Sequence, residues 1–198
     1  MRGFTIIGLG GLLLAQTLAP YALAEDLTGD PAAGRKKAGL CRTCHGIEGL
    51  AKIPIAPHIG GENPNYIMHQ LTAFREGTRV HEMMSVVARG LDDQSIADLA
   101  AWYSSQDVSA ALAPGKTGDM APEACVACHG ADGLARIEDA PNLAGENAIY
   151  IDTQLKAFRT GKRTHPVMSE IAAGLSDTDI RAVAEWYAAT KIEIAPVK

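Results

Sequence analysis

Large aromatic side chains and spare cysteines are both scarce in this sequence. Phenylalanine, tryptophan and tyrosine make up 5% of the 198 residues, although 47% of the chain is hydrophobic. A small domain with so few large side chains has a marginal core, so something large and apolar is expected to complete it. All four cysteines belong to two CxxCH motifs, at 41–45 and 125–129, which leaves no thiol for a separate structural disulfide.

Basic charge and long apolar runs are limited too. Lysine and arginine total 18 against 23 acidic residues, a formal net charge of −5, so the basic face that nucleic-acid binding needs is not expected. The apolar run at 4–18 is short for a membrane span and is followed by Ala22-Leu23-Ala24. This predicts a signal peptide over 1–24, cleaved after Ala24, with an uncleaved anchor as the alternative. The mature chain is expected in the periplasm.

An internal repeat with a period of 84 residues dominates the remaining sequence. The matched residues include Cys41 and Cys125, Pro57 and Pro141, and Trp102 and Trp186. The pattern QLxAFRxGxR occurs at 70–79 and again at 154–163. We therefore predict two tandem domains, at 25–104 and 119–198. The segment 105–118 is expected to be an exposed linker, because it contains Ser, Pro and Gly.

Short helices are predicted in both halves. Asp30-Pro31 and Asn63-Pro64 each supply a cap followed by a proline in the first turn. Ser176 with Asp179 resembles a capping box, and Pro122 shortens the helix that leads into the second motif. Strand-like alternation is nowhere sustained, so the predicted fold class is all-α.

The segment CRTCHG at 41–46 has three interpretations: a zinc site, a redox disulfide and a haem attachment site. A zinc ribbon needs two CxxC pairs about 15 to 20 residues apart, and a thioredoxin-like pair belongs near a βαβ pattern. Neither requirement is met. CxxCH in an exported chain is the attachment signature of c-type haem, with the histidine as an iron ligand. We predict two covalently attached haem c groups, bound by Cys41, Cys44, Cys125 and Cys128, with iron ligands His45 and His129.

The second axial ligand of each iron has two candidates at matched spacing. These candidates are Met84 with Met168, and His81 with His165. Methionine is favoured, and Met/His ligation would raise the reduction potential of each haem. The histidines are otherwise expected to be exposed or hydrogen-bonded residues near the ligand. Met83 has no methionine counterpart and is expected to pack.

Other repeated residues suggest supporting roles. Pro57 and Pro141 could each place a carbonyl against the coordinated imidazole and so select its tautomer. Trp102 and Trp186 are expected to be core residues. Propionate binding or a solvated surface remains open for six residues: Tyr66, Tyr150, Arg75, Arg159, Arg79 and Arg163.

Together, CxxCHG, the segments APHIGGENPNYIMHQLTAFREGTR and APNLAGENAIYIDTQLKAFRTGKR, and a closing helix ending in WY resemble the dihaem cytochrome c4 family. The resemblance covers about residues 30–190 and implies two class I cytochrome c folds facing each other about a pseudo-twofold axis. It implies His/Met ligation by His45 with Met84 and by His129 with Met168. Gly-Glu stands where the family often has Gly-Gln, at 61–62 and 145–146.

The expected function follows from the ligation and the resemblance. Two six-coordinate haems leave no open iron position for a substrate, and neither repeat offers a nucleophile with a base. The chain is therefore expected to be an electron carrier, not an enzyme, passing single electrons between a dehydrogenase or quinol-oxidising complex and a terminal oxidase or other acceptor. Some of these partners would be membrane-associated.

The alternative is the cytochrome subunit of a periplasmic dehydrogenase that oxidises sulfide or thiosulfate. A dihaem peroxidase is disfavoured, because one haem would have to lose its methionine.

Overall fold

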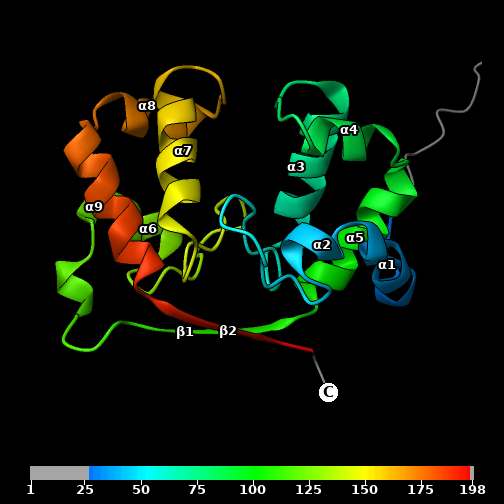
Figure 1. The fold of residues 1–198 in the computed structure, drawn as a ribbon, viewed down its shortest axis with the longest axis horizontal. Coiled ribbons are helices and arrows are strands. Elements are labelled where there is room, and N and C mark those ends of the chain that lie inside the picture. Colours follow the sequence, from blue (N-terminus) through cyan, green and yellow to red (C-terminus); the bar gives the residue numbers. More distant parts are fainter. Residues whose placement is uncertain (1–26, 197–198) are drawn as a thin grey trace, which may run out of the picture.

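Two helical lobes lie side by side, and a two-stranded ribbon runs beneath both (Figure 1). The computed structural model describes residues 27–196. The predicted signal peptide and its cleavage after Ala24 lie outside this part of the chain. Within the described part, no helix combines the length and the apolar character needed to cross a membrane.

The first lobe contains α1 (Pro31–Lys37), η1 (Ala38–Leu40), α2 (Arg42–His45), α3 (Pro64–Glu76), α4 (Met84–Arg89) and α5 (Asp93–Ser104). Its helices begin where the capping residues predict. The Asp30 side chain accepts a hydrogen bond from Ala32 N, and the Asn63 side chain accepts one from Asn65 N. Helix α3 ends at Gly77, whose φ of 80° suits glycine.

The second lobe contains η2 (Gly118–Met120), α6 (Glu123–His129), α7 (Ala148–Arg159), α8 (Pro166–Ala173) and α9 (Asp177–Ala188). The capping box between Ser176 and Asp179 is present. Helix α6 begins directly after Pro122, as predicted. In the first lobe, α1 packs along α5 so closely that a Cβ at Gly34 would collide with the Asp98 carbonyl.

Each lobe has its own small apolar core. In the first, α3 and α5 pack together around Ile67, Leu99 and Tyr103. In the second, α7 and α9 pack in the same way around Ile151 and Tyr187. Among the described residues, the largest fully buried side chains are Tyr103, Tyr187, Leu99 and Ile180. Helices α5 and α9 therefore supply the largest buried side chains of the two cores, and the first cysteine of each CxxCH motif packs against these cores.

The ribbon consists of β1 (Asp107–Ala111) and β2 (Lys191–Ala195), paired antiparallel. The all-α class is confirmed for the two lobes, but the expectation that strands are lacking is wrong at these two segments, and β1 lies inside the predicted linker. Each strand alternates exposed and half-buried residues. Such alternation suits a ribbon with one face against the protein and one face in solvent.

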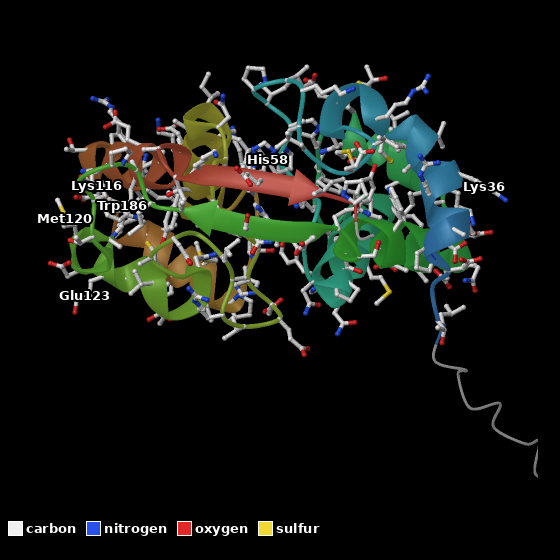
Figure 2. All side chains as sticks on the ribbon, turned by 90° about the horizontal axis from the view of Figure 1, so that it is seen from below. Lys36, His58, Lys116, Met120, Glu123 and Trp186 are labelled. Carbon is white, nitrogen blue, oxygen red and sulfur yellow. The ribbon has the colours of Figure 1, made fainter. Side chains whose placement is uncertain are left out.

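The ribbon contacts both lobes (Figure 2). Val108 of β1 lies against Gly61 of the first lobe, and Ile192 of β2 lies against Gly145 of the second. Ile194, farther along β2, reaches Gly60 of the first lobe. Because β2 follows α9 yet contacts the first lobe, the ribbon helps to hold the two lobes together.

Candidate functional site

Both CxxCH motifs end a helix with a buried histidine. His45 is the last residue of α2, and His129 is the last residue of α6. The glycine after each histidine has a positive φ, 75° at Gly46 and 71° at Gly130, so the chain turns away sharply. Helices α2 and α6 lie in different lobes (Figure 1), which gives two separate sites.

The two imidazoles are oriented by proline carbonyls. His45 Nδ1 lies 2.8 Å from the Pro57 carbonyl oxygen, and His129 Nδ1 lies 2.9 Å from that of Pro141. A carbonyl only accepts, so Nδ1 carries the hydrogen and Nε2 keeps a free lone pair. Burial lowers the pKa of both imidazoles, which favours their neutral form. The predicted contact of each proline carbonyl with an imidazole is confirmed.

The four cysteines are half-buried and form no disulfide with one another. They are Cys41, Cys44, Cys125 and Cys128. The first cysteine of each motif packs against the core of its lobe. Burial raises the pKa of the Cys41 thiol, and it raises that of Cys125 to about 11. With a neutral imidazole beside each pair, these residues fit a covalently attached haem.

The candidate methionines lie at the start of matching helices. Met84 begins α4, and Met168 lies in the first turn of α8; both side chains are half-buried. The Met84 amide donates to His81 Nδ1 at 3.4 Å, and the Met168 amide donates to His165 Nδ1 at 3.2 Å. The histidines therefore have a structural part in placing the methionine turns. Because each Nδ1 accepts from a backbone amide, the neutral imidazole carries its hydrogen on Nε2 and offers an iron no free ring lone pair, unlike His45 and His129. This favours the hydrogen-bonded interpretation over bis-histidine ligation.

Two details of these turns were not anticipated. His165 Nε2 lies 2.9 Å from Asp139 Oδ2, which ties the α8 turn to the loop after the second motif. Met83 is 62% exposed, so the expectation that it packs is wrong; Met68 instead packs against the first core.

The closing helices hold the segments after the motifs through four side chains. The indole nitrogens donate to backbone carbonyls, Trp102 to Ile47 at 2.7 Å and Trp186 to Ala131 at 2.9 Å. The tyrosine hydroxyls donate to the carbonyls of the positive-φ glycines, Tyr103 to Gly46 at 3.4 Å and Tyr187 to Gly130 at 3.1 Å. The tryptophans are half-buried and pack against the edge of each core, so the expectation that they are core residues is met only in part. The part played by the tyrosines was missed, although the repeated WY pair at 102–103 and 186–187 was the available signal.

Two arginines connect the lobes. Each bonds a glutamine and a tyrosine of the other lobe: Arg79 reaches Gln154 at 2.9 Å and Tyr150 at 3.4 Å, and Arg163 reaches Gln70 at 3.0 Å and Tyr66 at 3.1 Å. Burial raises the pKa of Tyr66. The interpretation as solvated surface residues is therefore wrong for Arg79, Arg163, Tyr66 and Tyr150.

Arg75 and Arg159 have a different role. Each donates to a carbonyl beyond the following short helix, Leu91 O and Leu175 O respectively. Each also pairs with an aspartate at the start of the closing helix, Asp93 or Asp177. These arginines brace the inside of one lobe and do not cross to the other.

Comparison with known proteins supports the same interpretation. Residues 118–186 match the family model described as cytochrome c oxidase, cbb3-type, subunit III. The chain is similar to cytochrome c4 of Pseudomonas aeruginosa, with 34% identity covering 87% of this chain and 94% of that protein. It is also similar to the thiosulfate dehydrogenase electron acceptor of Thiomonas intermedia, with 33% identity over 80% of this chain and 82% of that protein.

A solved structure gives the same result for the fold. The crystal structure of reduced recombinant cytochrome c4 from Pseudomonas stutzeri superposes with a TM-score of 0.72 at 30% identity, covering 83% of this chain and all of that one. Sequence identity, fold and the two cysteine-histidine sites therefore agree. This chain belongs to the cytochrome c4 family and is a dihaem c-type cytochrome that carries electrons.

Proposed function

We propose that the chain binds its two haems through two equivalent sets of residues, one in each lobe. The first set is Cys41, Cys44, His45 and Met84, and the second is Cys125, Cys128, His129 and Met168. We further propose that the mature protein works in the periplasm after cleavage at Ala24. The domains would span 25–104 and 119–198, with 105–118 between them including strand β1.

The observation that best supports this proposal is the orientation of the two histidines, His45 and His129. Each imidazole is buried, neutral and held by a proline carbonyl, so that its Nε2 lone pair faces away from that carbonyl. Such an outer hydrogen bond fixes the tautomer of a metal ligand and increases its basicity. Each haem, when bound, exchanges single electrons at its iron. The protein would supply the covalent anchor and the ligand set.

The methionines complete this proposal. A thioether ligand opposite histidine raises the reduction potential of a haem. High potentials suit a protein that takes electrons from a dehydrogenase or quinol-oxidising complex and delivers them to a terminal acceptor. His81 and His165 position the methionine turns by accepting from their amides.

The near-infrared sulfur-to-iron charge-transfer band of the oxidised protein tests the ligand set. We expect this band in the native protein and its loss in the Met84→Ala/Met168→Ala variant. Met83→Ala is the matched control, since Met83 is a neighbouring but exposed methionine and the band should persist. A band that survives the double substitution would contradict methionine ligation and make His81 and His165 the leading candidates.

A second function is supported by the Thiomonas relative, which is named a thiosulfate dehydrogenase electron acceptor. This chain could likewise be the electron-accepting subunit of a periplasmic dehydrogenase. Purification of the native protein under mild conditions separates the two functions. A stoichiometric complex with a dehydrogenase would favour the subunit, whereas a free dihaem protein that is reduced and reoxidised by separate partners would favour the carrier.

A further inference from the structure

Two buried carboxyl groups lie at the junction of the lobes. Glu62 and Glu146 are only 4% and 2% exposed. Each accepts a hydrogen bond from a backbone amide of the opposite lobe: Asn142 N donates to the two oxygens of Glu62 at 3.0 and 3.1 Å, and His58 N donates to Glu146 Oε1 at 2.6 Å. The carboxyl groups therefore hold the lobes together reciprocally.

The same two partners make a second pair of bonds across the junction. Asn142 Nδ2 donates to the Gly61 carbonyl at 3.1 Å. His58 Nδ1 accepts from Ala51 N at 2.9 Å, so Nε2 carries the hydrogen and donates to the Gly145 carbonyl at 3.1 Å. Figure 2 shows His58 beside the ribbon, between the lobes. The glutamates thus belong to a compact set of bonds between the lobes, separate from the arginine set.

No cation neutralises these carboxyl groups within residues 27–196, where no ion pair includes either one. The titratable and charged groups around them are His58 from the first-lobe loop, Tyr66 from α3 with Arg79 and Arg163 close to it, Arg136 and Glu138 beside the cleft that Glu62 lines, and each other. Arg136 is already paired with Asp132. From the ribbon, the apolar side chains of Val108 and Ile192 lie against the glycines that precede the glutamates.

A carboxylate buried without a cation is unfavourable, and such a group keeps its proton instead. Burial raises the pKa of Glu62 to about 8 and that of Glu146 to about 9, the latter also because of the nearby Glu62 charge. Glu146 Oε2 is buried and has no hydrogen-bond partner in the described structure. A neutral carboxyl group at this position avoids an unpaired buried charge.

We propose that Glu62 and Glu146 are positioning residues that form a proton-dependent clasp between the lobes. While both are neutral, the clasp holds the two haem sites in one relative geometry. Loss of their protons to solvent leaves two charges in the junction and loosens it. An effect of this loosening on electron transfer between the two haem sites rests on the proposed function, whereas the clasp itself does not.

The direction and size of the pH effect follow from proton linkage. In the closed junction the carboxyl groups hold their protons up to about pH 8 or 9, whereas exposed glutamates lose them near the ordinary value of 4.5. Between these limits the closed state binds more protons than the open state. The ratio of closed to open protein therefore falls about tenfold per pH unit for each carboxyl group, and about a hundredfold for both.

Hydrogen exchange at the His58 and Asn142 amides measures this opening in the reduced holoprotein. After correction for the intrinsic pH dependence of exchange, their protection should fall steeply between about pH 6 and about pH 8 in the native protein. Glutamine has the shape of a neutral carboxyl group and does not titrate. The Glu62→Gln/Glu146→Gln variant should therefore keep its protection at every pH, and the exposed control Glu76→Gln/Glu185→Gln should behave like the native protein.

The single variant Glu146→Gln provides a second measurement if the double variant does not fold. Protection of the His58 and Asn142 amides against exchange should fall about tenfold per pH unit in this variant, compared with about a hundredfold in the native protein. Protection that is flat with pH in the native protein, or that falls equally in native and glutamine variants, would overturn the proposal. Neither result would affect the near-infrared band, so failure of the clasp is distinguishable from failure of the ligand assignment.

Discussion

Docking of the ribbon on the first lobe can be tested at Gly61. This residue has a φ of 73°, and a Cβ there would lie 2.6 Å from Val108 Cβ and Cγ1 of strand β1. Gly61→Ala therefore carries two penalties. The positive φ costs about 1 kcal/mol for a residue with a Cβ, and the collision with Val108 adds about 1 to 3 kcal/mol through displaced backbone.

Gly77 offers a matched control for the first penalty. Its φ is 80°, but a Cβ there would meet no atom within 4 Å. Gly77→Ala should therefore cost about 1 kcal/mol, which corresponds to about 2 to 4 °C in Tm for a chain of this size. Gly61→Ala should lower the Tm at least twice as far. Thermal unfolding of the holoproteins, followed by far-ultraviolet circular dichroism, measures both shifts.

The collision itself can be isolated with Val108→Gly, which removes the atoms that a Cβ at Gly61 would meet. The Gly61→Ala/Val108→Gly variant should be more stable than the sum of its two single changes predicts, because the two residues are in contact. Equal Tm shifts for Gly61→Ala and Gly77→Ala, together with additive effects in the double variant, would refute the close docking of β1 against Gly61.

Two further predictions concern the haems. The Cys41→Ala/Cys44→Ala variant should be expressed in a host able to attach haem. Its first lobe should show no cooperative calorimetric transition, because the small core of this lobe depends on the covalent haem. A cooperatively folded first lobe without haem would contradict this. The second-lobe haem should have the lower of two potentials, because Glu138 and Asp139 replace Pro54 and Ile55 of the first lobe. Glu138→Ala/Asp139→Ala should narrow the separation in a redox titration, and a single unsplit potential, or a separation that the change leaves intact, would count against the electrostatic explanation.

Local signals predicted the helices well. The caps Asp30, Asn63 and Ser176 all lie where the structure begins a helix, because a short polar side chain followed by proline or an acidic residue acts within a few residues. The proline carbonyls beside the imidazoles were also predictable. They depend on a short loop of fixed length between histidine and proline, repeated in both lobes.

The ribbon was harder to predict because each strand is short and its partner is distant in the chain. The segment KIEIA at 191–195 does alternate, and this signal was overlooked. The segment DVSAA at 107–111 carries little strand preference, since Ser and Ala pack weakly on a pleated surface. Only pairing with β2 makes it a strand, and no local rule supplies that partner.

The junction was beyond prediction for a related reason. The Gly-Glu pairs were noted as departures from the family, but burial of Glu62 and Glu146 depends on how the two lobes meet. Likewise, Arg79 and Arg163 could be assigned no partners until the opposite lobe was in place. Residues whose neighbours come from another lobe carry no periodic or spacing signal of their own.

The antiparallel ribbon also has a consequence for the order of events during synthesis. Asp107 pairs with Ala195, so β1 is made long before its partner strand. Both cysteine-histidine segments are complete before β2 is made. Pairings between residues so distant in sequence form slowly. Each lobe can therefore collapse around its own helices first, and the contact of Ile194 with Gly60 closes the assembly only afterwards.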